Sequence, residues 1–144
     1  MGERSGEKRR TGKRRTGGEI LVDQLVIQGV DRGYCVPGES YLAVLDALYD
    51  TDIELITCRH EGGASMMAEA YGKLTNRPGI CFVTRAPGFV NAMSGIHIAK
   101  QDSTPMIIFV GQIDTRMRER EAFQEINYRT LLSDHVKWVT EIED

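Results

Sequence analysis

The sequence predicts a doubly wound α/β domain, with a mostly parallel sheet and helices on both of its faces. From Gly18 onward, short apolar runs alternate with stretches of helical periodicity. Two of these runs, Ile80 to Val83 and Met106 to Val110, are apolar at every residue. Strands of that composition need cover on both faces, which a parallel sheet between two helical layers provides.

The size and composition fit one globular domain. The chain has 144 residues, of which 41% are hydrophobic and 27% are charged, and these are ordinary values for a soluble protein. No apolar run approaches the roughly 18 residues that a membrane-spanning helix needs. We therefore expect no membrane association.

The first elements are a helix, a strand and a second helix. Apolar residues recur at helical spacing from Gly18, and the pattern stops at Gly29, a common residue after a helix end. The run "GYCV" then predicts a short strand, which "PG" closes. In "SYLAVLDALYD", Ser40 precedes apolar residues at helical spacing and predicts the cap of the next helix.

The same order of strand and helix repeats and then loosens. We expect strands at 52–58, 79–85 and 105–112, with helices at 61–76 and 87–101 between them. Within the first of these helices, Met66 and Met67 stand at helical spacing and are expected to pack in the core. Residues 112–135 are charged and weakly helical, and "VKWVTEI" (136–142) predicts a last short strand.

The charge is unevenly distributed, although the net charge is only -3. Residues 1–17 hold seven Lys or Arg against two acidic residues and have no apolar residue after Met1. Such a segment cannot bury surface, so we expect a disordered basic tail at 1–17 and a folded domain at 18–144. The tail lacks interleaved aromatic residues, so we expect no nucleic-acid partner.

Cysteine and histidine are dispersed. The three cysteines, Cys35, Cys58 and Cys81, lie in apolar segments and form no Cys-x-x-Cys pair. We interpret them as reduced core residues of a cytoplasmic protein. The histidines show no ligand spacing either, so we expect no metal site held by this chain.

The functional residues are expected in the turns that follow the strands. In open α/β sheets the ligand crevice lies beyond the carboxyl ends of the strands, and the turns there read "VPGES", "RHEGG", "TRAPGFVN" and "GQIDTR". Glu61 begins a helix in the second turn, where the simplest role is a carboxylate stabilised by the helix end. The small residues at 62–65 also let another molecule approach, and an enclosed carboxylate is suited to sharing a proton with a ring nitrogen.

The stretch "RHEGGASMMAEAYGKLTNRPGICFVTRAPGFVN" resembles the pyrimidine-binding domain of thiamine diphosphate-dependent enzymes, nearest the acetolactate synthases. The likeness runs from about Glu19 to the C-terminus. In that family the Glu of this motif hydrogen-bonds to N1′ of the cofactor's aminopyrimidine, which implies the same role for Glu61. Protonation of N1′ favours the imino form, whose nitrogen then removes the thiazolium proton.

The resemblance also implies the other site residues. Those expected to border the cofactor are Pro37, Gly38, Pro87 and Asn91. Those expected to line the substrate channel are Glu39, Ser40, Phe123 and Gln124. The third turn departs from the family's Gly-Pro-Gly-Ala-Thr-Asn pattern at three positions, Ala86, Phe89 and Val90. Because Phe89 and Val90 are bulkier than their counterparts, we expect them to narrow the space near the cofactor.

The resemblance further implies that this chain holds half of a site. Family members hold thiamine diphosphate against a second domain of another chain, whose Gly-Asp-Gly and Asn-Asn residues carry Mg²⁺ and the diphosphate. Neither motif occurs here, so we expect weak cofactor binding and no turnover by the chain alone. The implied substrate is pyruvate or a similar 2-oxo acid and the implied assembly a homo-oligomer, with FAD only in full-length relatives.

Two other functions remain open at this point. The chain is alternatively a non-catalytic module that associates with full-length relatives through the helix bearing Glu61. It is otherwise an unrelated nucleotide-binding domain, although no G-x-G-x-x-G follows any expected strand.

Overall fold

A computed structural model describes residues 14–142 and shows a four-stranded, entirely parallel sheet. The strands are β1 (Arg32–Cys35), β2 (Glu54–Thr57), β3 (Gly79–Val83) and β4 (Met106–Val110), in the order β2-β1-β3-β4. The chain moves from β1 outward to β2, and then crosses back to β3 and β4 on the other side. The winding direction therefore reverses between β1 and β3.

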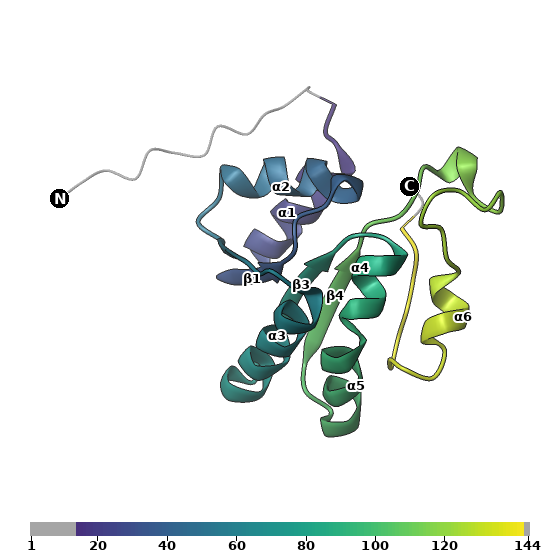
Figure 1. Ribbon diagram of the computed structural model, residues 1–144. Helices are drawn as coiled ribbons and strands as arrows, with labels where there is room; N and C mark the ends of the chain where they lie inside the picture. Colours follow the sequence, from purple (N-terminus) through teal and green to yellow (C-terminus); the bar gives the residue numbers. More distant parts are fainter. Residues whose placement is uncertain (1–13, 143–144) are drawn as a thin grey trace.

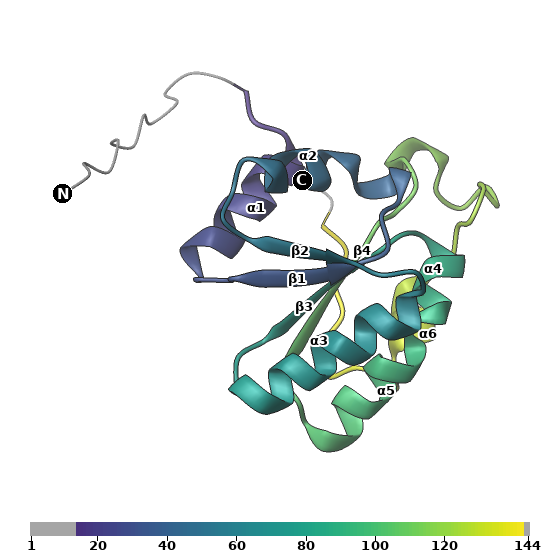
Figure 2. The same cartoon turned by 60° about the vertical axis from the view of Figure 1, so that its left-hand side comes forward.

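Helices cover both faces of the sheet, which confirms the doubly wound α/β fold (Figure 1). Figure 2 shows α1 (Gly17–Ile27) and α2 (Leu42–Tyr49) on one face. The opposite face carries α3 (Glu61–Thr75), α4 (Ala86–Asn91), α5 (Met93–Asp102) and α6 (Tyr128–Leu132). Two short 3₁₀ helices, η1 (Glu39–Tyr41) and η2 (Thr115–Met117), follow β1 and β4.

Each face has its own hydrophobic core, and β3 contributes to both. Ile80 and Phe82 point into the core under α1 and α2, while Cys81 and Val83 point into the core under α3 and α5. This alternation follows from the period of two of a strand, and it explains why every residue of β3 is buried. Cys35 and Cys81 are buried, Cys58 is half-buried, and none of the three is in a disulfide.

The first helix begins one residue earlier than predicted. Thr16 accepts a hydrogen bond from the Glu19 amide at 3.1 Å, and the Glu19 carboxylate accepts one from the Thr16 amide at 2.7 Å. This reciprocal capping box starts α1 at Gly17. Most of the predicted basic tail, residues 1–13, lies outside the described residues.

The prediction that Met66 and Met67 pack in the core is wrong, because each side chain is 39% exposed. The buried face of α3 consists instead of small or polar residues: Ala64, Ser65, Ala68, Glu69 and Gly72. They allow close backbone contact, since a Cβ on Gly79 of β3 would come 1.8 Å from the Ala68 carbonyl oxygen. The buried small residues of α3 thus pack against the protein's own sheet and α5, whereas Gly63 and Ala70 of the same helix are exposed.

Two further element predictions are wrong. The helix expected at 87–101 is divided into α4 and α5 at Ala92. In the tight turn between them, the Ala92 amide donates a hydrogen bond to the Phe89 carbonyl. Residues 136–142 form no strand, because no strand of the described chain pairs with them. Val136 and Val139 pack on the core while Trp138 is 76% exposed. Among the described strands, β4 therefore has a neighbour on one side alone.

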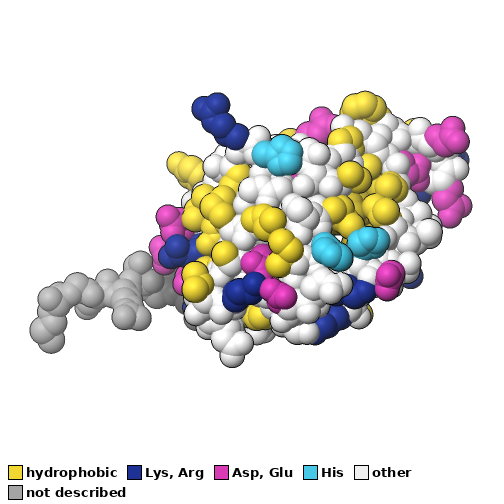
Figure 3. Space-filling model, turned by 60° about the horizontal axis from the view of Figure 1, so that its bottom comes forward, with side chains coloured by type: hydrophobic (Ala, Val, Ile, Leu, Met, Phe, Trp, Pro, Cys, Tyr) yellow, Lys and Arg dark blue, Asp and Glu magenta, His cyan; other side chains and the backbone are white. Residues whose placement is uncertain are grey.

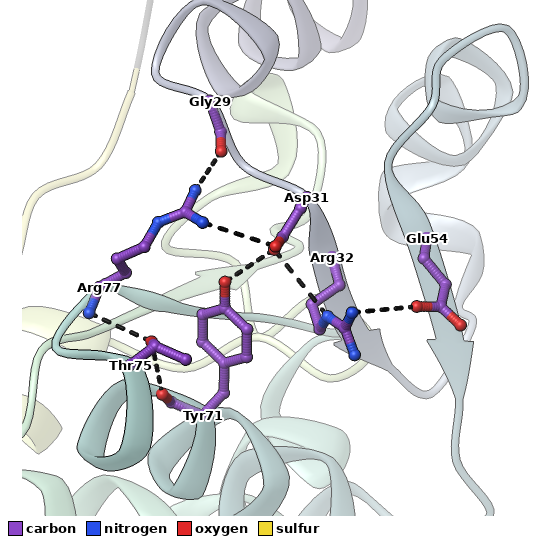
Figure 4. Close-up of polar contacts among 7 residues, drawn as sticks. All are labelled: Gly29, Asp31, Arg32, Glu54, Tyr71, Thr75 and Arg77. Carbon is purple, nitrogen blue, oxygen red and sulfur yellow. Dashed lines mark hydrogen bonds and ion pairs between the residues drawn. The ribbon is translucent and has the colours of Figure 1, made fainter.

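A polar cluster fixes the C-terminal end of α3 to the beginning of β1 (Figure 4). Asp31 accepts a hydrogen bond of 2.7 Å from the Tyr71 hydroxyl and pairs with Arg77 at 3.5 Å. Arg32 lies over the Tyr71 ring, with its guanidinium carbon 5.8 Å from the ring centroid. The Tyr71 hydroxyl holds the pKa of Asp31 below its usual value, with help from the two arginines. This cluster lies at the end of the sheet opposite the turns predicted to carry function.

Candidate active site

The predicted site residues gather at the carboxyl ends of the strands. The turns after β1 and β3 meet where the winding direction reverses, which is the usual place for a ligand crevice in such a sheet. The beginning of α3 and the segment around Phe123 reach the same end of the sheet, as hydrogen bonds to the β3 turn show. Four separate segments therefore meet at one place.

Glu61 is the first residue of α3, and only 9% of it is exposed. His60 caps the helix by accepting a 3.0 Å hydrogen bond from the Gly62 amide to Nδ1. The Glu61 Oε2 atom accepts a hydrogen bond of 3.0 Å from Nδ2 of Asn91 in α4. Among residues 14–142 the structure gives the other oxygen, Oε1, no hydrogen-bond partner. A buried carboxylate with one hydrogen-bonded oxygen thus begins α3, although His60 and Gly63 on either side of it are exposed.

Gly88 closes the space around this carboxylate. A Cβ atom at Gly88 would come 2.8 Å from the Thr84 methyl group and 3.0 Å from Oε1 of Glu61. Pro87 beside it is exposed, as is Pro37 after β1. The absence of a side chain at Gly88 therefore leaves room for Oε1 close to the backbone of α4.

A hydrogen bond between two side chains connects the turn after β1 to the turn after β3. The hydroxyls of Ser40 and Thr84 lie 2.9 Å apart in a hydrogen bond. A Cβ atom at Gly38 would come 2.5 Å from the Thr84 Cβ, and one at Gly111 would come 1.8 Å from the Ser40 Oγ. Ser40 consequently points toward the ends of β3 and β4, where Gly111 leaves room for it.

Arg85 connects the two predicted channel segments. Its Nη2 lies 2.5 Å from Oε1 of Glu39, and its Nη1 donates to the Phe123 carbonyl at 3.4 Å. The Ala86 amide donates to the Gln124 carbonyl at 3.3 Å, and the Phe123 side chain is 74% exposed. Thr84 and Arg85 were missed in the sequence, although both directly follow the central strand β3 and so occupy the reversal point.

Phe89, one of the two bulky residues expected to narrow the space near the cofactor, packs into the hydrophobic core. Phe89 is fully buried and packs edge to face on Tyr128, with ring centroids 5.3 Å apart. Val90 is half exposed. Phe89 therefore fills the core rather than the space beside the carboxylate.

Burial shifts the neighbouring acidic groups away from ionisation. It raises the pKa of the Cys81 thiol to about 12 and the pKa of the Tyr128 hydroxyl to about 12. The Tyr41 hydroxyl, which donates to the Val36 carbonyl, also has a raised pKa because of burial. None of these three groups is an anion at neutral pH, and the buried carboxyl group at this end of the sheet is that of Glu61.

Residues 15–131 match the family model described as thiamine pyrophosphate enzyme, N-terminal TPP binding domain. The chain belongs to this family. It is 39% identical over 125 residues to the mitochondrial acetolactate synthase catalytic subunit of Aspergillus candidus, which covers 86% of this chain and 18% of that protein. The acetolactate synthase of Bacillus subtilis is 36% identical over 128 residues, covering 89% of this chain and 22% of that protein.

The family membership confirms the resemblance found in the sequence. The chloroplastic acetolactate synthase of Arabidopsis thaliana is also similar, at 35% identity over 134 residues. The chain spans about a fifth of the length of these relatives. Residues 14–142 contain no helix long and apolar enough to cross a membrane and no group of three or more side chains arranged to hold a metal ion.

Proposed function

We propose that this chain forms the pyrimidine-binding half of a thiamine diphosphate site in an acetolactate synthase-like 2-oxo acid carboligase or decarboxylase. Glu61 is the residue that activates the cofactor. The observation that carries the proposal is the buried Glu61 carboxylate, of which one oxygen accepts a hydrogen bond from Asn91 and the other has no hydrogen-bond partner among residues 14–142.

This arrangement fits an aminopyrimidine ring. A ring nitrogen that shares a proton needs one carboxylate oxygen in a place from which water is excluded. Gly88 places no side chain beside Oε1, and Asn91 fixes the carboxylate by its other oxygen. When bound, thiamine diphosphate supplies the carbon nucleophile that attacks a 2-oxo acid.

The chain's own residues would then bind and orient the cofactor. Glu61 holds a proton at the ring nitrogen, and the backbone around Gly38 and Pro87 borders the ring. The hydrogen bond between Ser40 and Thr84 keeps the turns after β1 and β3 at a fixed separation. Glu39 and the segment at Phe123 and Gln124 form the approach for the substrate, for which pyruvate is our proposal.

We propose that a second domain completes the site. The cofactor's charge lies on its diphosphate, and diphosphates are held by Mg²⁺ or by helix ends and basic groups. The proposed partner is a diphosphate-binding, Mg²⁺-carrying domain, in a homo-oligomer whose full-length members use FAD in some cases. We also propose a cytoplasmic location, in which Cys35, Cys58 and Cys81 would be kept as thiols.

A specific observation favours a second candidate, a non-catalytic association module. The outward face of α3 carries exposed apolar side chains, including Met66, Met67 and Leu74, the last 85% exposed. Figure 3 views the molecule from the side of α3 and α5 and shows hydrophobic side chains grouped in patches on this surface. Exposed apolar patches of this kind mark association surfaces.

The test measures binding of thiamine, which carries the aminopyrimidine without the diphosphate. We expect thiamine to shift the backbone amide NMR signals of Gly88 and Asn91 in the labelled chain. Glu61→Gln should weaken this binding by at least tenfold, because an amide cannot share a proton with the ring nitrogen. Glu54→Gln, on the outer strand β2, is the matched control and should bind thiamine normally.

Equal thiamine binding by the Glu61→Gln and wild-type chains would refute the cofactor role. In that case, the non-catalytic association module would gain support if the chain formed oligomers, if Met66→Lys abolished them and if Glu61→Gln did not change them.

A further inference from the structure

Arg85 is a charged residue at the site that the sequence did not single out. Its side chain is only 14% exposed, whereas its ion-pair partner Glu39 is 70% exposed. The guanidinium lies between the turn after β1 and the segment that contains Phe123, the two segments predicted to line the substrate channel. A largely buried cation thus sits where the substrate is proposed to pass.

The hydrogen bonds of Arg85 leave part of its guanidinium unused. Nη1 donates to the Phe123 carbonyl, and Nη2 meets a single oxygen of Glu39. Nε is buried and has no hydrogen-bond partner in the structure. In a guanidinium the Nε and Nη2 hydrogens point from the same edge, and a carboxylate with two oxygens matches that edge with two parallel bonds.

We propose that Arg85 binds the carboxylate of the 2-oxo acid and that Glu39 is a resident counter-ion, which the substrate displaces. The inference rests on the proposed function, because that function supplies a substrate with a carboxylate. In the displaced state Nε and Nη2 both donate to the ligand, while Nη1 keeps its bond to the Phe123 carbonyl. Glu39 turns into solvent, where most of its side chain already lies.

The unequal exposure of the two partners makes the exchange feasible. An ion pair with an exposed carboxylate contributes little stability, because water solvates the separated carboxylate almost as well. In the described residues Arg85 keeps one buried donor, Nε, without a hydrogen-bond partner, and a second carboxylate oxygen would supply that partner. A planar carboxylate accepts from Nε and Nη2 together and carries a negative charge, whereas a neutral ester of the same acid lacks both the charge and the second equivalent oxygen.

The experiment follows the Arg85 side-chain Nε signal by NMR in the labelled 144-residue chain during a titration with sodium pyruvate. Sodium chloride is the salt control, and methyl pyruvate is the uncharged control. We expect saturable millimolar binding of pyruvate and none of methyl pyruvate. Arg85→Met should abolish binding, whereas Arg77→Met, which removes an ion-paired arginine at the opposite end of the sheet, should not change it.

Glu39→Gln is the decisive variant. Removing the competing carboxylate should tighten pyruvate binding by up to about fivefold, the factor that corresponds to an exposed ion pair. If Arg85 serves only to tie the two segments together, Glu39→Gln will leave pyruvate affinity unchanged or lower it, and the proposal fails. It fails equally if methyl pyruvate binds as well as pyruvate, or if inorganic phosphate binds more tightly than pyruvate.

The outcome is separable from that of the cofactor proposal. Glu61→Gln should weaken thiamine binding and leave pyruvate binding at Arg85 intact. Loss of the Arg85 effect with normal thiamine binding overturns only the carboxylate role, and the reverse pattern overturns only the role of Glu61. A dispersed amide spectrum for each variant shows that it is folded.

Discussion

The contact between β3 and α3 makes a sharp prediction about Gly79. A Cβ added there would lie 1.8 Å from the Ala68 carbonyl oxygen and 2.6 Å from its carbonyl carbon. Real Cβ atoms essentially never come within 3.0 Å, so the strand and the helix would have to separate by about 1.2 Å. Because the obstacle is backbone, no side chain can rotate out of the way.

Gly79→Ala should therefore lower the free energy of unfolding by about 3 kcal/mol, the upper end of the range for overpacked cores. Gly63→Ala is the control, because Gly63 lies in α3, the helix that contacts Gly79, and a Cβ at Gly63 meets nothing within 4 Å. It should raise the free energy of unfolding by about 0.5 kcal/mol, since alanine loses less conformational entropy in a helix.

Urea unfolding followed by circular dichroism measures both variants. With a slope near 1.5 kcal/mol per molar urea, the midpoint of Gly79→Ala should fall by about 2 M relative to the wild-type chain. If the urea midpoints of Gly79→Ala and Gly63→Ala lay within about 0.3 M of each other, α3 and β3 could separate at little cost in free energy. The prediction from close backbone contact would then be wrong.

Further predictions concern pH and thiol reactivity. The pKa of Asp31 is lowered from 3.8, chiefly by the Tyr71 hydroxyl, so its contribution is present above about pH 4 and is lost as the pH falls through the folded-state value. Tyr71→Phe should thus cost up to about 1 kcal/mol at pH 7, discounted because Asp31 is half exposed, and urea midpoints of the two chains should converge at low pH. A constant difference from pH 7 to pH 2 would contradict this assignment. Burial protects Cys35 and Cys81, so in native protein only the half-buried Cys58 should react with an aromatic disulfide within minutes, as mass spectrometry of the labelled peptides would show. Prompt labelling of Cys81 would contradict the buried position of β3.

The fold was predictable because its signals are local. Apolar runs of four or five residues, such as Ile80 to Val83, define strands that need cover on both faces, and this requirement implies the layered α/β fold. The capping box of Thr16 and Glu19 is also a local signal, because its two residues lie three positions apart in the sequence.

The errors arose where the decision depends on distant contacts. Met66 and Met67 have the same helical spacing whether they face the core or solvent, and the small residues on the other face of α3 decide the matter. "VKWVTEI" has strand composition, but a strand also needs a partner, and no described strand lies beside it. Local sequence carries neither kind of information.

The candidate site shows the same division. Glu61 was found from its motif and its position after a strand, and the structure brings it to Asn91. The role of Arg85 could not be predicted from the sequence, because it depends on a contact with Glu39, which is 46 residues away in the chain. Contacts between turns depend on the order of the strands in the sheet, and no local stretch of sequence determines that order.

The close seat of α3 on the sheet also bears on how the position of Glu61 is set. Ala68 lies seven residues, or about two helical turns, beyond Glu61, and the backbone there rests directly on β3. At the far end, Gly72 rests against the Pro105 carbonyl, where a Cβ would come within 2.2 Å. These backbone contacts fix the position of the whole of α3, so we expect a displacement at one of its ends to be transmitted to the other. An added methyl group at Gly79 or Gly72 would displace the distant carboxylate without touching it, so altered cofactor affinity is expected from substitutions more than one turn away from the site.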